Sequence, residues 1–109
     1  MGLFNFIGEI IQQSVTDIQE AQMISEDWDV ESICRELQRT SSLSKSAGYS
    51  NTLRSKCRKM SNKKLMSAFD YVCNQKNSKA CKAMMPVMQD RGLAYEDDNG
   101  RIVRTYNNR

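Results

Sequence analysis

The sequence predicts a mainly α-helical fold, a small bundle of four to five helices that ends in a C-terminal β-hairpin. Three observations lead to this prediction. Apolar residues recur at helical spacing in successive segments of the 109-residue chain, as they do on helices that bury one face. Asp, Ser and Asn residues, which favour helix starts, precede several of these segments. Near the end, an Asn-Gly dipeptide separates two short runs with strand propensity, which is typical of a hairpin turn.

The first predicted helix covers residues 3–23. Its apolar positions fall on one arc of a helical wheel, and its charged positions lie opposite. Such an arc needs a partner surface, so we expect it to be buried in the fold or to form a self-association face. The residues proposed for that face are Leu3, Ile7, Ile11 and Ile18. The polar side carries Glu9, Asp17 and Glu20, which anionic lipid headgroups repel, so no membrane docking is expected.

The next two helices flank a serine-rich connection. Asp29 is suited to cap the first of them, whose inward positions are Val30, Ile33, Cys34 and Leu37. The other is predicted over residues 45–60, with an inward face formed by Ala47, Leu53, Cys57 and Met60. Gly48 lowers the intrinsic helix propensity of that segment.

Two further helices complete the predicted bundle. Ser61 is expected to cap a helix that runs to residue 74, with an apolar stripe of Leu65, Met66, Phe69, Val72 and Cys73. Another helix begins at Asn77 or Ser78 and is expected to bury Cys81, Met84, Met85 and Met88. Pro86 lies inside it and should kink or split it, and Gly92 marks its end.

The last predicted element is a hairpin over residues 94–106, with a two-residue type I′ turn at Asn99-Gly100. In that register one face of the hairpin carries Leu93, Tyr95, Ile102, Arg104 and Tyr106. An isolated hairpin is only marginally stable in water, so this face is expected to pack on the helices.

We expect a single helical domain over residues 1–109 that is divided by charge. Its acidic helical part covers residues 1–40, its basic helical part 41–93 and its hairpin 94–106. Residues 1–36 have a net charge of −7, residues 37–93 one of +10, and the whole chain one of +3. This segregation steers a nucleic acid or an acidic partner toward the basic part, unless the acidic helices neutralise it within the fold.

The residue types available for chemistry predict neither an enzyme nor a cofactor. Histidine is absent, which removes the commonest general base and a frequent metal ligand. The cysteines are Cys34, Cys57, Cys73 and Cys81. They form no CxxC pair, so we expect free thiols on apolar helix faces without a metal site. The chain shows no membrane span and no secretory signal pattern, which leads us to expect a cytoplasmic location.

Basic residues form the second candidate surface, for nucleic-acid or acidic-partner contacts. They are Arg54, Arg58, Lys59, Lys63, Lys64, Lys79, Lys82, Arg101 and Arg104. From Ser61 onward, a helix, a short turn, a helix ending in Arg91-Gly92-Leu93 and an Asn-Gly hairpin follow one another. This order resembles the end of a winged helix-turn-helix domain. The resemblance implies DNA binding by residues 54–104, with the second of these helices in the major groove.

Two functional hypotheses follow from these features. The first is a non-enzymatic macromolecule-binding protein, an adaptor, inhibitor or immunity-type protein that acts through protein–protein contacts. The alternative is a winged-helix-like nucleic-acid-binding regulator. We expect a protein partner or a homodimer first and a nucleic acid second, with no membrane partner and no small-molecule substrate.

Overall fold

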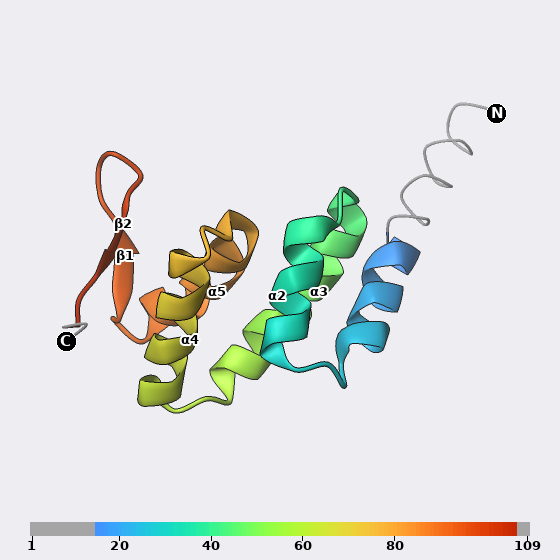
Figure 1. Ribbon diagram of the computed structural model, residues 1–109, viewed down its shortest axis with the longest axis horizontal. Coiled ribbons are helices and arrows are strands. Elements are labelled where there is room, and N and C mark those ends of the chain that lie inside the picture. The colour runs from blue at the N-terminus through green and yellow to red at the C-terminus, as the bar shows by residue number, and fades with distance from the viewer. Residues whose placement is uncertain (1–14, 107–109) are drawn as a thin grey trace.

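The computed structural model describes residues 15–106 as a helical bundle with a hairpin at its C-terminal end (Figure 1). A helix over residues 15–25 comes first. The elements that follow are α2 (Val30–Arg39), α3 (Leu43–Arg58), α4 (Asn62–Asn74), α5 (Ser78–Asp90), β1 (Ala94–Glu96) and β2 (Ile102–Arg104). The predicted fold class, mainly α with a C-terminal β-hairpin, is confirmed. The first part of the predicted helix 3–23 lies outside the described residues.

Each labelled helix begins at a polar side chain that accepts a hydrogen bond from a backbone amide of the first turn. Asp29 accepts from the Ser32 amide at 2.8 Å, and Ser61 accepts from the Lys64 amide at 3.2 Å. The caps predicted at Asp29 and Ser61 are confirmed, and Asn77, one of the two residues predicted to start the last helix, caps α5 in the same way. The fourth cap, Ser42, starts α3 two residues before the predicted boundary. Because a cap satisfies an amide with no partner in the helix, these side chains decide where each helix starts.

The C-terminal ends of α4 and α5 share one geometry. Gly92 follows α5 at φ 67°, and the Leu93 amide reaches back to the Met88 carbonyl at 2.9 Å. After α4 the same left-handed position is taken by Lys76 at φ 56°, and the Asn77 amide bonds the Val72 carbonyl at 3.1 Å. Both ends are Schellman motifs. The second joins α4 to α5 in a tight turn.

Helix α5 is the centre of the core. It packs against α2, α3, α4 and β1, and its buried side chains are Ala80, Cys81, Ala83, Met84, Met85, Val87 and Met88. Pro86 does not split it, contrary to one of the two expected outcomes, since α5 runs from Ser78 to Asp90 with Pro86 inside. The proline is only half-buried.

The helix over residues 15–25 packs on α3 through small residues. Gly48 of α3 lies so close to it that a Cβ there would be 2.5 Å from the Ile18 carbonyl oxygen and 2.6 Å from the Ala21 Cβ. Ser25, which is fully buried, donates to the Thr52 hydroxyl at 2.9 Å. Of the inward residues predicted for the helix over residues 45–60, Leu53 and Cys57 are buried, whereas Ala47 and Met60 are half-buried.

The hairpin register differs from the predicted one. Ala94 pairs with Arg104, Tyr95 with Val103 and Glu96 with Ile102. The turn therefore contains three residues, 98–100, and the two-residue turn was wrong. Gly100 adopts φ 77°, its amide bonds the Asp97 carbonyl at 3.0 Å, and Asp97 Oδ1 accepts from the Asn99 and Arg101 amides. This is the three-residue turn in which a left-handed glycine forms a bulge.

The one-residue change of register moves side chains to the other face of the hairpin. Tyr95 does not share a face with Ile102 and Arg104, as predicted; it lies on the opposite face and is 49% exposed. Ala94 takes its place and is buried against the helices. The expectation that the hairpin packs on the helices is confirmed. Of the residues predicted for the packed face, Leu93 and Tyr106 pack on the core, and Ala94 joins them.

Candidate interaction surfaces

The cysteines and acids of the described residues were the first candidates for a metal site or a nucleophile. In residues 15–106 no three Cys, Asp or Glu side chains come together in a way that could hold a metal ion. Burial raises the pKa of both Cys34 and Cys57 to about 11, so neither thiol forms a thiolate nucleophile near neutral pH. No helix in the described part of the chain combines the length and the hydropathy needed to span a bilayer.

A groove lies along the outer side of α2. Its volume is about 680 Å³, and it is lined by Trp28, Asp29, Ser32, Arg35, Glu36, Gln38 and Arg39. Trp28 stacks on the buried Tyr49 ring of α3, with 5.6 Å between the ring centroids and 21° between their planes. The stack holds an indole at the edge of the groove. We call this hollow the α2 groove.

Charges of both signs surround the α2 groove. Arg35 is exposed and donates to the Ser32 hydroxyl at 3.3 Å, while Arg39 lies 3.8 Å from Glu36. The amide and side-chain hydrogen bonds from Ser32 hold the pKa of Asp29 below its usual value, so its carboxylate is ionised in the physiological range. The sequence pattern did not predict this groove. Its residues occupy the polar side of a short helix, which the pattern indicates only as a solvent-exposed face.

A second, apolar furrow lies on the other flank of α2, toward α4. Its volume is about 230 Å³, and its lining residues are Val30, Glu31, Cys34, Ala68, Tyr71 and Val72. The Tyr71 side chain is 49% exposed at the edge of this furrow. Together the α2 groove and the furrow leave both flanks of α2 open on the described surface.

The basic residues predicted as a nucleic-acid surface divide into separate groups. Arg58 and Lys59 end α3, and Lys63 and Lys64 lie in the first turn of α4; all four are exposed. We call these four residues the basic junction. The ion pairs found within residues 15–106 join Glu36 with Arg39 and Asp70 with Arg104. None of the four basic residues is therefore paired with a carboxylate of this range.

The remaining predicted contacts lie elsewhere or are already engaged. Lys79 donates to the Thr40 carbonyl at 2.6 Å, and Arg104 is paired with Asp70 at 2.8 Å. Arg54 bonds Asn51 within α3. Lys82 faces a hollow beside the hairpin, and Arg101 lies in the hairpin next to Gly100.

Helices α4 and α5 are antiparallel, and this orientation separates the lysines further. Cys73 near the end of α4 touches Cys81 near the start of α5, and Arg91 after α5 bonds Asn62 at the start of α4. The basic junction therefore lies at one end of this helix pair, and Lys79 and Lys82 lie toward the other. Seven buried side chains on the 13-residue α5 also leave it little free surface for entering a DNA groove.

The proposed self-association face lies mostly outside the described residues. Leu3, Ile7 and Ile11 lie outside residues 15–106, and Ile18 is half-buried beside Gly48. Further along the same helix, Met23 and Ile24 are exposed, at 74% and 57%. The described part of this helix thus combines a buried side, which faces α3, with an exposed side on which Met23 and Ile24 lie among polar residues.

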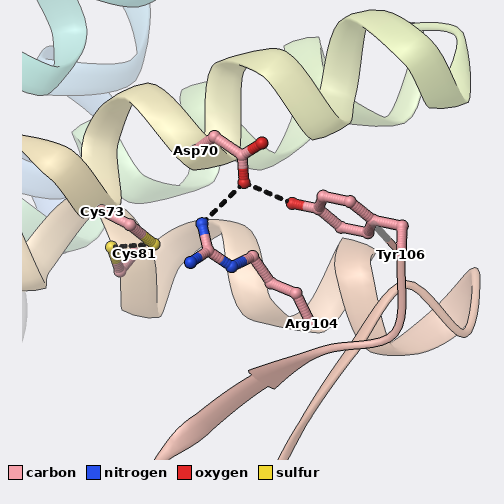
Figure 2. A network of polar contacts seen from close by, with 5 residues as sticks. All are labelled: Asp70, Cys73, Cys81, Arg104 and Tyr106. Carbon is pink, nitrogen blue, oxygen red and sulfur yellow. Dashed lines mark hydrogen bonds and ion pairs between the residues drawn. The ribbon is translucent and has the colours of Figure 1, made fainter. Parts of the chain in front are cut away.

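The hairpin is fastened to α4 by one carboxylate (Figure 2). Asp70 Oδ1 accepts a hydrogen bond from Arg104 at 2.8 Å and another from the Tyr106 hydroxyl at 2.7 Å. Burial and the bond to Asp70 raise the pKa of Tyr106, so its phenol stays protonated. Beside Arg104, the sulfur atoms of Cys73 and Cys81 are 3.4 Å apart.

Comparisons with protein-family models, with curated proteins and with solved structures each find no match to this chain.

Proposed function

We propose that this protein is a non-enzymatic binding module that recognises a protein partner through the α2 groove. The observation that carries the proposal is the Trp28–Tyr49 stack at the edge of a hollow of about 680 Å³. Tryptophan and arginine are the residues most enriched among those that dominate binding energy at protein interfaces. Here Trp28 is held in place by Tyr49, and Arg35 and Arg39 lie in the same groove.

The chemistry of the α2 groove favours a protein over a small substrate. A small-molecule site typically has a mostly apolar lining with a few converging polar groups. This groove is instead surrounded by two arginines and two acids, which suits the mixed charges of a protein surface and provides orientation as well as affinity. The apolar furrow beside Tyr71, on the other flank of α2, adds a place for one or two apolar side chains of the same partner. An adaptor, an inhibitor or an immunity-type protein would use such a surface.

A site-specific photocrosslinking experiment tests this proposal. A photoreactive amino acid replaces Gln38 in the groove or, as a matched control, Lys45, which is exposed on α3. In cells that make the protein, the groove position should yield a defined protein adduct that the control does not. Arg35→Glu should abolish the adduct, and Lys45→Glu, an equal charge change elsewhere, should preserve it. Equal adducts from both positions, or no adduct at Gln38, would rule the groove out.

A second candidate function is supported by the basic junction. Arg58, Lys59, Lys63 and Lys64 are exposed where α3 meets α4, and no carboxylate of residues 15–106 pairs with them. Exposed lysines and arginines grouped in this way attract phosphate backbones without reading sequence. We therefore propose weak, non-specific nucleic-acid binding as the alternative, with the basic junction rather than α5 as its contact surface.

A further inference from the structure

Two of the four cysteines lie in contact at the boundary of the core. The sulfur atoms of Cys73 and Cys81 are 3.4 Å apart, within hydrogen-bonding distance for thiols. All four cysteines are free, and Cys73 and Cys81 are the two whose sulfur atoms are in contact. Cys73 lies in the last turn of α4 and Cys81 in the first turn of α5. A turn of three residues connects these helices, so the two sulfur atoms belong to helix ends rather than to the middle of a helix.

The pair is open to small molecules on one side. A hollow of about 280 Å³ is lined by Cys73, Lys76, Ser78, Cys81, Lys82, Glu96, Gly100 and Ile102. Cys73 is half-buried there, whereas Cys81 is 7% exposed behind it. Lys76 and Lys82 are exposed on the rim, and their two positive charges outnumber the single negative charge of Glu96, so the rim attracts small anions. Apart from these charged residues, the lining is largely apolar and includes Ile102 and the two sulfur atoms.

The geometry points to a redox-active dithiol, and we propose that Cys73 and Cys81 form an intramolecular disulfide when the protein meets an anionic low-molecular-weight disulfide. The sulfur atoms need to approach from 3.4 Å to about 2.05 Å. This movement is about the length of one covalent bond, and the adjoining turn can supply it. Cys34 and Cys57 are both buried and do not line this hollow, so they stay reduced.

Accessibility determines the order of the two exchange steps. Cys73 loses its proton to solvent, and its thiolate attacks one sulfur of the small disulfide. A mixed disulfide forms on Cys73 as the small molecule's S–S bond breaks, and the departing thiolate takes up a proton. Cys81 then loses its proton, attacks the Cys73 sulfur and expels the second half of the small molecule as a thiol. Two electrons pass from the two cysteines to the small disulfide, which ends as two thiols.

The environment of Cys81 fits the resolving role in the second step. Burial raises its pKa, and the hydrogen bond with Cys73 raises it further, while the nearby Arg104 lowers it. Its thiol is therefore protonated and unreactive toward outside reagents until a mixed disulfide forms within reach. The resulting bond would join the end of α4 to the start of α5 and constrain the unfolded chain. We expect the oxidised form to melt at a higher temperature than the reduced form.

Peptide mapping of the folded, full-length protein tests this proposal. The probe is oxidised glutathione, which is an anionic disulfide. Trypsin cuts after Lys76 and Lys79, so Cys73 and Cys81 fall in different peptides. We expect the intact protein to lose the mass of two hydrogen atoms. The peptides that contain residues 65–76 and 80–82 should become linked, and a thiol reductant should reverse both changes.

Three variants provide controls. Cys34→Ser/Cys57→Ser should oxidise like the wild type, because it keeps the pair. Cys81→Ser should stop at a glutathione adduct on Cys73, because the resolving thiol is missing. Cys73→Ser should form neither adduct nor link. Linkage of Cys34 or Cys57, stable glutathione adducts on the wild type, or reaction only after denaturation would each overturn the proposal.

Discussion

Gly48 acts through its missing side chain, although the sequence alone presents it as a weakness in a helix. Its intrinsic cost to α3 is about 1 kcal/mol relative to alanine. The helix over residues 15–25 passes so close that a Cβ on Gly48 would lie 2.5 Å from the Ile18 carbonyl oxygen. Backbone atoms cannot yield as a flexible side chain can, so this glycine allows the two helices to approach.

We therefore expect Gly48→Ala to destabilise the protein. Overpacking costs about 1–3 kcal/mol, and the gain in helix propensity offsets about 1 kcal/mol of that. A net loss of about 1 kcal/mol would lower the melting temperature by about 4–8 °C in a chain of this size. Ser55→Ala, an exposed position on α3, is the control and should leave the temperature unchanged or raise it slightly. An equal rise in both variants would show that the two helices do not need this close contact.

The buried thiols make a second residue-scale contribution, which depends on pH. Burial raises the pKa of Cys57 from 9.0 to about 11. The folded state thus keeps the proton at a pH where the unfolded chain has released it. The stability that Cys57 contributes is fully present below pH 9.0 and is lost as the pH rises through about 11.

Cys57→Ala should accordingly flatten the alkaline loss of stability. Between pH 9.0 and 11 the free energy of unfolding should fall further in the wild type than in the variant. The difference between the two falls should be about 2 kcal/mol. Urea denaturation at several pH values, with a reductant present, measures both slopes. The variant will also be less stable at neutral pH, because a cavity replaces the sulfur. Parallel pH profiles for the wild type and the variant would show that the pKa of Cys57 is the same in the folded and the unfolded protein.

At the scale of elements, a few polar side chains connect the end of one helix to another helix or to the hairpin. Arg91, which follows α5, donates to the Met60 carbonyl at 2.7 Å and to the Arg58 carbonyl at 2.9 Å, where α3 ends. It satisfies carbonyls that have no partner within the helix. Asp70 does the equivalent for the hairpin by accepting from Arg104 and Tyr106. The hairpin is thereby held on α4, although only three residues of each strand are paired.

Asp70→Ala should release the hairpin without unfolding the helices. Hydrogen bonds to charged groups contribute about 1.5–3 kcal/mol each, and partial exposure reduces this, so we expect a local loss of about 1–2 kcal/mol. Hydrogen exchange should become faster at the Asp97 and Thr105 amides, which bond across the hairpin, and stay unchanged in α5. Asp90→Ala, which removes an exposed acid from α5, should change neither. Faster exchange throughout α5 would mean that the hairpin and the helices unfold together.

At the scale of the whole molecule, charge is segregated along the chain. The ion pairs of residues 15–106 join near neighbours on α2, or α4 with the hairpin. Neither pair connects an acid of residues 15–36 to the basic junction. Lys56 reaches back to this N-terminal part, but it donates to the Glu26 carbonyl oxygen rather than to a carboxylate. Within residues 15–106, no ion pair therefore neutralises the basic junction.

We expect the protein to bind duplex DNA weakly and without sequence preference, with a dissociation constant of about tens of micromolar or weaker at physiological salt. Lys63→Ala/Lys64→Ala should weaken binding and reduce the slope of log affinity against log salt by about one unit per lost contact. Lys79→Ala/Lys82→Ala should have a smaller effect, since Lys79 is bonded to Thr40. Fluorescence anisotropy across a salt series measures both slopes. A sequence-selective nanomolar complex would replace protein recognition with the winged-helix alternative.

Local rules in the sequence were sufficient for the elements and most of their ends. Asp29 and Ser61 cap helices as predicted, α5 starts at one of the two predicted positions, and Gly92 ends it. The reason is that caps and helical periodicity depend on neighbours within a few residues. Local rules failed at the hairpin turn, where Asn-Gly fits both a two-residue and a three-residue loop. Asp97, which accepts two amides, accompanies the longer loop.

Contacts between residues far apart in the chain follow from the tertiary fold and could not be predicted. The sequence was enough to predict a mainly helical fold with a hairpin and its polar caps, and to exclude histidine chemistry. It did not determine that Trp28 stacks on Tyr49, or that the predicted basic residues separate into different groups. Nor did it place Cys73 against Cys81, because helical periodicity assigns each residue a face without naming the facing partner. Partners follow from how α4 and α5 cross the core, and packing over the whole chain determines that arrangement.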